Sequence, residues 1–210
     1  MDSSYASRNE LVTGLILFDI DGVIFDPEKF GKLIRTKFVK ILGISEEELI
    51  SANADYYSKL SERTDFDPRG ITAYLSDRFG KDVAPLDRVF WEDTDIYKNS
   101  LYPEAREVLE KLKGEKILGI FSQGNRDLQN RKLDAAELRD YFSPEYIFIH
   151  KRKLSDEAIE LLPREATFID NKHDVVEVLQ KFVDVIWINR KSDESDPKIK
   201  TIHSLAELTD

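Results

Sequence analysis

The feature that most constrains this chain is a series of short apolar runs, each followed by polar residues and then by a stretch with helical spacing. The runs are too short for helices and lack apolar/polar alternation, which predicts strands buried on both faces of a sheet. They are Leu15–Phe18, Ile117–Phe121, Tyr146–Ile149, Ala166–Ile169 and Asp184–Ile188. Because strands that alternate with helices form parallel sheets with right-handed crossovers, the pattern predicts an α/β fold with a doubly wound parallel sheet.

Four segments with helical character lie between or after these runs, at 103–113, 126–138, 155–162 and 174–182. In the first of them, Pro103 and Glu104 suit the first turn of a helix. Lys111 and Lys113 suit its last turn, because cations favour the carboxyl end of the helix dipole.

The stretch between the first two runs contains no comparable strand. Apolar residues recur at helical spacing from Phe30 to Leu42, and Ser45 followed by three glutamates predicts an N-cap. Segments 71–79 and 85–97 also have helical spacing. Because this stretch is too long for a crossover connection, we expect a core of residues 1–26 and 100–210 with a helical cap, residues 27–99, covering one end of the sheet.

The charge balance excludes several classes of partner. The chain has 31 Lys and Arg against 41 Asp and Glu, a net charge of −10, which disfavours a nucleic acid polymer or an anionic membrane. A small phosphorylated metabolite is compatible with it, because a metal ion and a few local cations outweigh the global field. With no cysteine, and a polar start unlike a signal peptide, we expect a cytoplasmic protein whose first ten or so residues are frayed.

In an open parallel sheet, ligands bind beyond the carboxyl ends of the strands. The residues that follow the first four runs are Asp19, Asp21 and Gly22, then Ser122 and Gln123, then Lys151, Arg152 and Lys153, then Asp170 and Asp174. Converging carboxylates repel one another unless a hard cation lies between them, which points to Mg²⁺. A metal, a lysine and a hydroxyl group together predict a phosphate site, in which one aspartate of the first pair could attack and the other handle a proton.

Four segments, in this order, resemble the motifs of the haloacid dehalogenase-like hydrolase superfamily in its double-aspartate phosphatase form. They are FDIDGVIFD (18–26), IFSQGN (120–125), KRKLSDEAI (151–159) and ATFIDNKHD (166–174). The predicted cap resembles the C1-type cap of subfamily I. The sequence departs from the commoner pattern at Asn171, which stands where an acid is often found, and at Gln123, where many relatives have asparagine.

The resemblance implies a two-step phosphoryl transfer. Asp19 attacks phosphorus and forms an aspartyl-phosphate that water hydrolyses, while Asp21 acts as general acid and base. Mg²⁺ is held by the Asp19 carboxylate, the Asp21 backbone carbonyl and Asp170, with Asp174 ligating it or orienting a metal-bound water. Asp174 is equally suited to capping the helix that follows it.

The resemblance also assigns the phosphate-binding residues. Ser122 and the Gln123 backbone N–H hold phosphate oxygens, and Lys153 neutralises charge in the transition state, with Lys151 as the alternate lysine. Ser122 equally suits an N-cap.

The expected function is a Mg²⁺-dependent phosphatase acting on a small phosphomonoester, such as a sugar phosphate, phosphoglycolate or a nucleoside monophosphate. The alternatives are a phosphomutase that uses the same residues and a catalytically weak binding or regulatory protein on the same fold. Dehalogenation is disfavoured, because that chemistry needs neither Asp21 nor the metal. The oligomeric state is left open.

Overall fold

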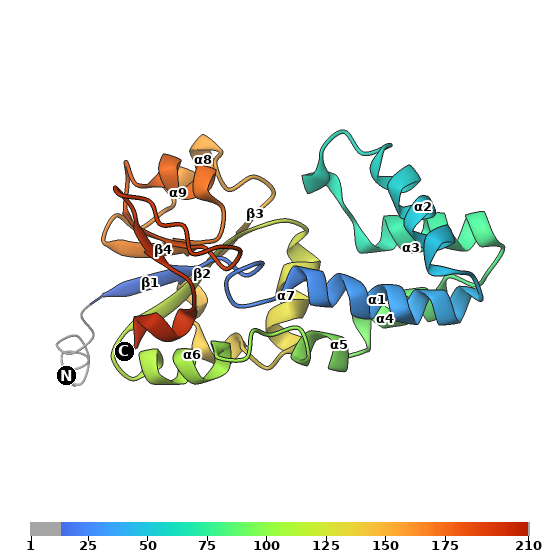
Figure 1. The fold of residues 1–210 in the computed structure, drawn as a ribbon, viewed down its shortest axis with the longest axis horizontal. Coiled ribbons are helices and arrows are strands. Elements are labelled where there is room, and N and C mark those ends of the chain that lie inside the picture. The colour runs from blue at the N-terminus through green and yellow to red at the C-terminus, as the bar shows by residue number, and fades with distance from the viewer. Residues whose placement is uncertain (1–13, 210) are drawn as a thin grey trace, which may run out of the picture.

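The computed structural model describes residues 14–209. Six strands form one parallel sheet in the order β3-β2-β1-β4-β5-β6 (Figure 1). They are β1 (Leu15–Phe18), β2 (Ile117–Gln123), β3 (Ile147–His150), β4 (Ala166–Asp170), β5 (Asp184–Ile188) and β6 (Lys200–Ile202). The predicted doubly wound α/β fold is confirmed, and β6 is an addition to the five predicted strands. The expected frayed N-terminal tail lies outside the described residues.

Helices cover both faces of the sheet (Figure 1). Leu15 and Leu17 of β1 belong to the hydrophobic cluster shared with α8 (Asp156–Glu160) and α9 (His173–Leu179). Phe18 belongs to the opposite cluster, which includes residues of α6 (Ala105–Lys113) and α7 (Arg126–Ala135). The central strand is therefore buried on both sides, which explains why it reads as a continuous apolar run.

The helices inserted between β1 and β2 extend beyond one end of the sheet (Figure 1). They are α1 (Pro27–Leu42), α2 (Glu46–Tyr57), α3 (Pro68–Phe79), α4 (Ala84–Trp91) and α5 (Asp95–Lys98), and a short 3-10 turn, Arg63–Asp65, joins α2 to α3. Ser45 caps α2 as predicted, with Glu48 completing a capping box.

Three local predictions were wrong. Segment 85–97 is two helices rather than one, because the Asp93 carboxylate accepts hydrogen bonds from the backbone N–H groups of Asp95 and Ile96 and so starts a new helix. Helix α6 begins at Ala105, so Pro103 precedes its first turn. Helix α9 begins at His173, so Asp174 lies inside it and does not cap it.

The register of the sheet sets where the site forms. Phe18, the last residue of β1, lies level with Ile120 of β2 and Ile169 of β4. The backbone N–H of Asp19 then donates to the carbonyl of Ile169, at 2.9 Å. Residues that follow these positions are thereby brought to one edge of the sheet. Within residues 14–209, no helix is long and apolar enough to cross a membrane.

Candidate active site

Four of the predicted site residues meet at the carboxyl edge of the sheet. The Ser122 hydroxyl donates to Oδ1 of Asp19 at 2.7 Å. The Lys153 ammonium lies 3.1 Å from the same Asp19 oxygen and 2.5 Å from Oδ2 of Asp170. All four residues are buried, with Asp19 the most exposed at 4%. Side chains from four different strand ends therefore form one continuous polar cluster.

The structure separates the two candidate lysines. Lys153 is buried, and its backbone N–H donates to the side-chain oxygen of Gln123 at 3.0 Å. Lys151 points away from the cluster and pairs with Asp65 of the inserted segment at 2.5 Å. Arg152 pairs with Glu62 of the same segment at 2.6 Å. The geometry therefore favours Lys153 as the lysine of the site.

Asp21 is held by two residues of α7 that the sequence analysis did not single out. Lys132 donates to both carboxylate oxygens of Asp21, at 2.6 and 2.7 Å. The Gln129 amide nitrogen donates to Oδ2 of Asp21 at 2.9 Å, and it also lies 3.3 Å from the Ser122 hydroxyl. A lysine and a glutamine three positions apart, both buried on one helix face, were the available signal, because that spacing places both side chains side by side.

The acidity of these groups follows from burial and nearby charge. Burial, opposed by the Lys153 charge and reinforced by the neighbouring Asp170 and Asp21, raises the pKa of Asp19 to about 6. Burial also works to raise the pKa of Asp21, but Lys132 and Gln129 outweigh it and hold that pKa below its ordinary value. Burial works to lower the pKa of Lys153, yet the carboxylates of Asp19 and Asp170 raise it. In this arrangement Asp21 is a carboxylate and Lys153 an ammonium at neutral pH.

Gly22 allows the chain to turn tightly beside β4. Its φ is +83°, in the region that favours glycine, and a Cβ atom there would lie 2.2 Å from the side-chain amide of Asn171. The departure from the commoner pattern at Asn171 thus places an amide against the turn that carries Asp21.

Two residues near the site do not join the cluster. Asp174 is exposed, and its carboxylate makes no hydrogen bond or ion pair within residues 14–209. Its predicted role toward the metal stays a prediction. His173 pairs with Asp196 at 2.8 Å and packs edge-on against Trp187.

Ser122 does not cap α7, because Asn125 does so by accepting from the Leu128 N–H.

The carboxylates of the site are the groups that could hold the expected Mg²⁺. No group of three or more histidine, aspartate or glutamate side chains in residues 14–209 is arranged to hold a metal ion. The predicted ligand set, which includes the backbone carbonyl of Asp21, stays a prediction. Asp19 and Asp170 nevertheless place two buried carboxylates against one ammonium group. Mg²⁺ binds through one or two carboxylates and keeps several waters, so these two residues fit it.

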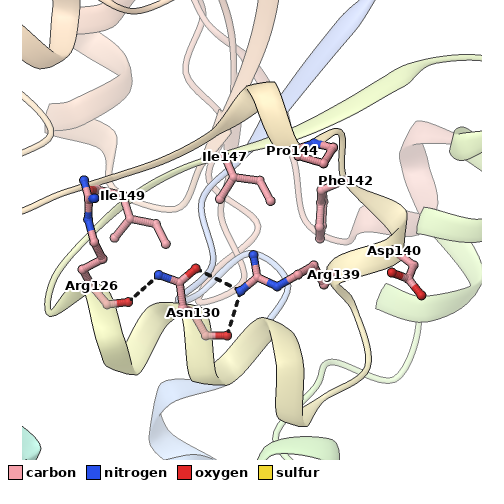
Figure 2. Close-up of a pocket in the computed structure, with 8 residues that line it drawn as sticks. All are labelled: Arg126, Asn130, Arg139, Asp140, Phe142, Pro144, Ile147 and Ile149. Atoms are coloured by element: carbon pink, nitrogen blue, oxygen red, sulfur yellow. Dashed lines mark hydrogen bonds between the residues drawn. The ribbon is translucent and has the colours of Figure 1, made fainter.

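Several cavities lie around the predicted site residues. One, of about 970 Å³, is lined by Asp21, Gln123, Gln129 and Lys132 on the core side and by residues of α1, α2, α3 and α4 on the other. The second, of about 620 Å³, lies between α7 and β3 (Figure 2). In the second cavity, Arg139 donates to the backbone and side-chain oxygens of Asn130, and none of the predicted site residues lines it. The first cavity therefore opens on the site at Asp21 and Gln123, and a third cavity, of about 620 Å³, is lined by Gln123 and Asp174.

Comparison with known proteins identifies the family. The family model of the haloacid dehalogenase-like hydrolases matches residues 13–170, well over half of the chain. The chain belongs to this family. The matched range contains β1, β2, β3 and β4 and with them every residue of the Asp19–Ser122–Lys153–Asp170 cluster.

Individual members of the family are similar to the chain at lower identity. A phosphoglycolate phosphatase from Aquifex aeolicus (strain VF5) is 29% identical over 133 residues, which are 61% of this chain and 57% of that protein. The matched region therefore spans little more than half of that relative.

Solved structures of other haloacid dehalogenase-like proteins share the fold. A HAD phosphatase from Thermococcus onnurineus has a TM-score of 0.58 and 23% identity, covering 93% of this chain and 95% of that one. The HAD-hydrolase YfnB from Bacillus subtilis, bound to magnesium, has a TM-score of 0.63 and 16% identity, covering 94% and 97%. Dehalogenases are also among the matching structures. At these identities the structural matches show the fold alone.

Proposed function

We propose that this haloacid dehalogenase-like hydrolase is a Mg²⁺-dependent phosphatase that hydrolyses a small phosphomonoester through an aspartyl-phosphate on Asp19. The observation that carries the proposal is the cluster in which the Asp19 carboxylate meets the Ser122 hydroxyl and the Lys153 ammonium, with Asp170 on the same lysine. A nucleophile beside a hydroxyl donor and a buried cation is suited to attack on a phosphoryl group.

The first step forms a bond between an Asp19 oxygen and phosphorus and breaks the ester P–O bond, with a proton from Asp21 passing to the departing alcohol. In the second step Asp21 takes a proton from water, whose oxygen attacks phosphorus and releases phosphate from Asp19. Ser122 and Lys153 hold the phosphoryl oxygens in both steps. Lys132 and Gln129 stabilise the base form of Asp21, so its acid form requires that these contacts loosen.

Asp19 and Asp170 are the residues that would hold Mg²⁺. When bound, the ion would offset the negative charge that these carboxylates share with the phosphoryl group. A structural neighbour of the same fold, the Bacillus subtilis hydrolase, was solved with magnesium bound, which makes Mg²⁺ the first ion to test.

Three alternatives differ from this proposal in a measurable way. A phosphomutase returns the phosphoryl group to its substrate and releases little inorganic phosphate. Some structural neighbours are dehalogenases, and dehalogenation needs neither Asp21 nor Mg²⁺. The hydrogen bonds from Lys132 and Gln129 to the Asp21 carboxylate therefore favour the phosphatase. A binding or regulatory protein on this fold turns over no phosphomonoester.

The test is release of inorganic phosphate from a panel of phosphometabolites, together with release of p-nitrophenol from p-nitrophenyl phosphate, each with Mg²⁺ and with EDTA. We expect Mg²⁺-dependent release that is abolished in Asp19→Asn, whose fold is checked by circular dichroism. Unchanged turnover in Asp19→Asn would contradict the role of Asp19. Absence of release from every ester would contradict the phosphatase proposal.

A further inference from the structure

The cavity that opens on the site is large compared with a two-carbon substrate. Its volume is about 970 Å³, which is near the upper end of the range for pockets that hold drug-sized ligands. Asp21, which in the proposed reaction protonates the departing alcohol, lines it. The body of the substrate therefore extends from Asp21 into this space.

The walls contributed by the inserted helices are apolar and rich in aromatic rings. They include Phe30, Ile34, Phe38, Ile50, Tyr57, Phe66, Ile71 and Phe90. Tyr57 and Phe66 stack on each other with ring centroids 5.8 Å apart. Ile50 is 53% exposed and lies on the wall formed by α2. These walls suit a flat apolar ring more than a sugar or a short acid.

Two residues that line the cavity each have a buried side-chain oxygen with no hydrogen-bond partner within residues 14–209. The Gln129 nitrogen donates to Asp21 and to the backbone oxygen of Gln123, which are acceptors only, so the amide orientation is fixed. Its Oε1 is then left buried without a partner, on a side chain that is 3% exposed. Asn53, across the cavity on α2, also has a buried oxygen without a partner. Both oxygens are closed off from solvent, so the hydrogen-bonding groups of a ligand in the cavity do not reach them.

Charged groups that could recognise a second anion are already paired. Among the described residues that line the cavity, the cations are Arg35 and Lys132. Arg35 lies 3.4 Å from Glu46, and Lys132 is held by Asp21. The cavity therefore offers no free positive charge to a carboxylate such as that of phosphoglycolate, the substrate named for the Aquifex aeolicus relative.

We infer that the substrate is the phosphomonoester of an uncharged alcohol of nucleoside size that bears an aromatic ring. This inference rests on the proposed function and specifies its substrate class. The phosphoryl group lies at Asp19 and Ser122, and the aromatic ring lies between α1 and α2.

The decisive comparison is kcat/KM for adenosine 5′-monophosphate against ribose 5-phosphate, which share the leaving hydroxyl and differ by the aromatic base. We expect the nucleotide to be favoured by about tenfold or more, with 2-phosphoglycolate poorer still. Equal values for the first two esters, or the highest value for 2-phosphoglycolate, would overturn the inference.

A pair of matched variants tests the wall itself. Ile50→Ser should lower kcat/KM for adenosine 5′-monophosphate several-fold more than for ribose 5-phosphate. Leu161→Ser is the control, because Leu161 is also 53% exposed but does not line the cavity. It should leave kcat/KM unchanged for both esters. An equal effect of Ile50→Ser on both esters would count against an aromatic ring at α2.

Binding of adenosine, measured by calorimetry, separates this inference from the proposed function because it needs no turnover. Adenosine binding that Ile50→Ser weakens, without phosphate release from any ester, would overturn the function and support the aromatic occupant. If the protein releases phosphate without preferring the nucleotide and does not bind adenosine, the phosphatase proposal is supported and the aromatic substrate is overturned.

Discussion

The ammonium group of Lys132 contacts both carboxylate oxygens of Asp21, at 2.6 and 2.7 Å, although the two residues are 111 positions apart in the chain. The same ammonium lies over the ring of Phe25, 5.1 Å from its centroid. Lys132 is 5% exposed, so the contact forms in a site of reduced dielectric, where a charge pair is stronger than on the surface. Helix α7 thereby fixes the side chain that handles the proton in the proposed reaction.

Lys132→Met should raise the pKa of Asp21, because burial is then no longer outweighed by the cation. The limb of the pH–rate profile that Asp21 governs should move to higher pH. A carboxylate with a depressed folded pKa stabilises the fold above its unfolded value of 3.8, and this contribution is lost as pH falls through the folded value. Since the Asp21 side chain is 32% exposed, we expect the variant to lose about 1–3 kcal/mol at pH 7.

Lys111→Met is the control for that experiment, because Lys111 pairs with Glu107 on the exposed surface of α6. Such a pair contributes about 0.3–0.5 kcal/mol, and its loss should leave the pH profile in place. A Lys132→Met profile that superimposes on the wild-type profile would show that the lysine does not set the acidity of Asp21.

Asp19→Asn should make the metal-free protein more stable at neutral pH. Burial raises the pKa of Asp19 from 3.8 to about 6, so this group favours folding below pH 3.8 and loses that contribution as pH rises through 6. The neutral amide avoids the loss, which is at most about 3 kcal/mol. Thermal unfolding in EDTA should show a gain in Tm at pH 7 that shrinks toward pH 4.5. A gain in Tm that does not change with pH would contradict the raised pKa of Asp19.

Lys153→Met should be destabilising, and Mg²⁺ should partly compensate. The substitution leaves the side chains of Asp19 and Asp170, which are 6% and 0% exposed, without their shared cation, a change that costs about 3–5 kcal/mol. The rise in Tm on adding Mg²⁺ should therefore be larger in the variant than in the wild type. Adding Asp170→Asn should reduce that rise; if it does not, the ion binds elsewhere.

Gly22→Ala should destabilise more than Gly43→Ala. Both glycines have positive φ, +83° and +69°, so each substitution incurs a conformational cost of about 1 kcal/mol. At Gly43 a Cβ atom meets nothing within 4 Å, whereas at Gly22 it meets the Asn171 amide at 2.2 Å. Chemical denaturation of Gly22→Ala with and without Asn171→Ala should show that the second substitution recovers most of the difference. If the destabilisation in the double variant equals the sum of the two single effects, a clash with Asn171 does not explain the effect of Gly22→Ala.

The strands and most helices were predictable because burial on two faces leaves a plain signature in the chain. Leu15–Phe18 is apolar at every position since both sides of β1 are covered. β6 was missed because Lys200–Ile202 is three residues long and only Ile202 is buried. The break at Asp93 was missed because apolar spacing continues across it, while the hydrogen bonds that start α5 come from one side chain.

The site was only partly predictable, and for a different reason. Asp19, Ser122 and Asp170 each follow an apolar run, so their position at a strand end reveals them. Lys132 and Gln129 lie within a helix, where their spacing shows that they share a face but not which residue they contact across the fold. Asp174 stands close to Asp170 in the sequence and lies on α9 with its side chain exposed, and its metal role stays a prediction.

Three consecutive residues after β3 divide two tasks between them. Lys151 and Arg152 hold Asp65 and Glu62 of the segment that joins α2 to α3, while Lys153 enters the site. Any rearrangement of that joining segment must either break these ion pairs or pull on the backbone that carries Lys153. A change in that segment is therefore coupled through two peptide bonds to Lys153, which would face the phosphoryl group in the proposed reaction.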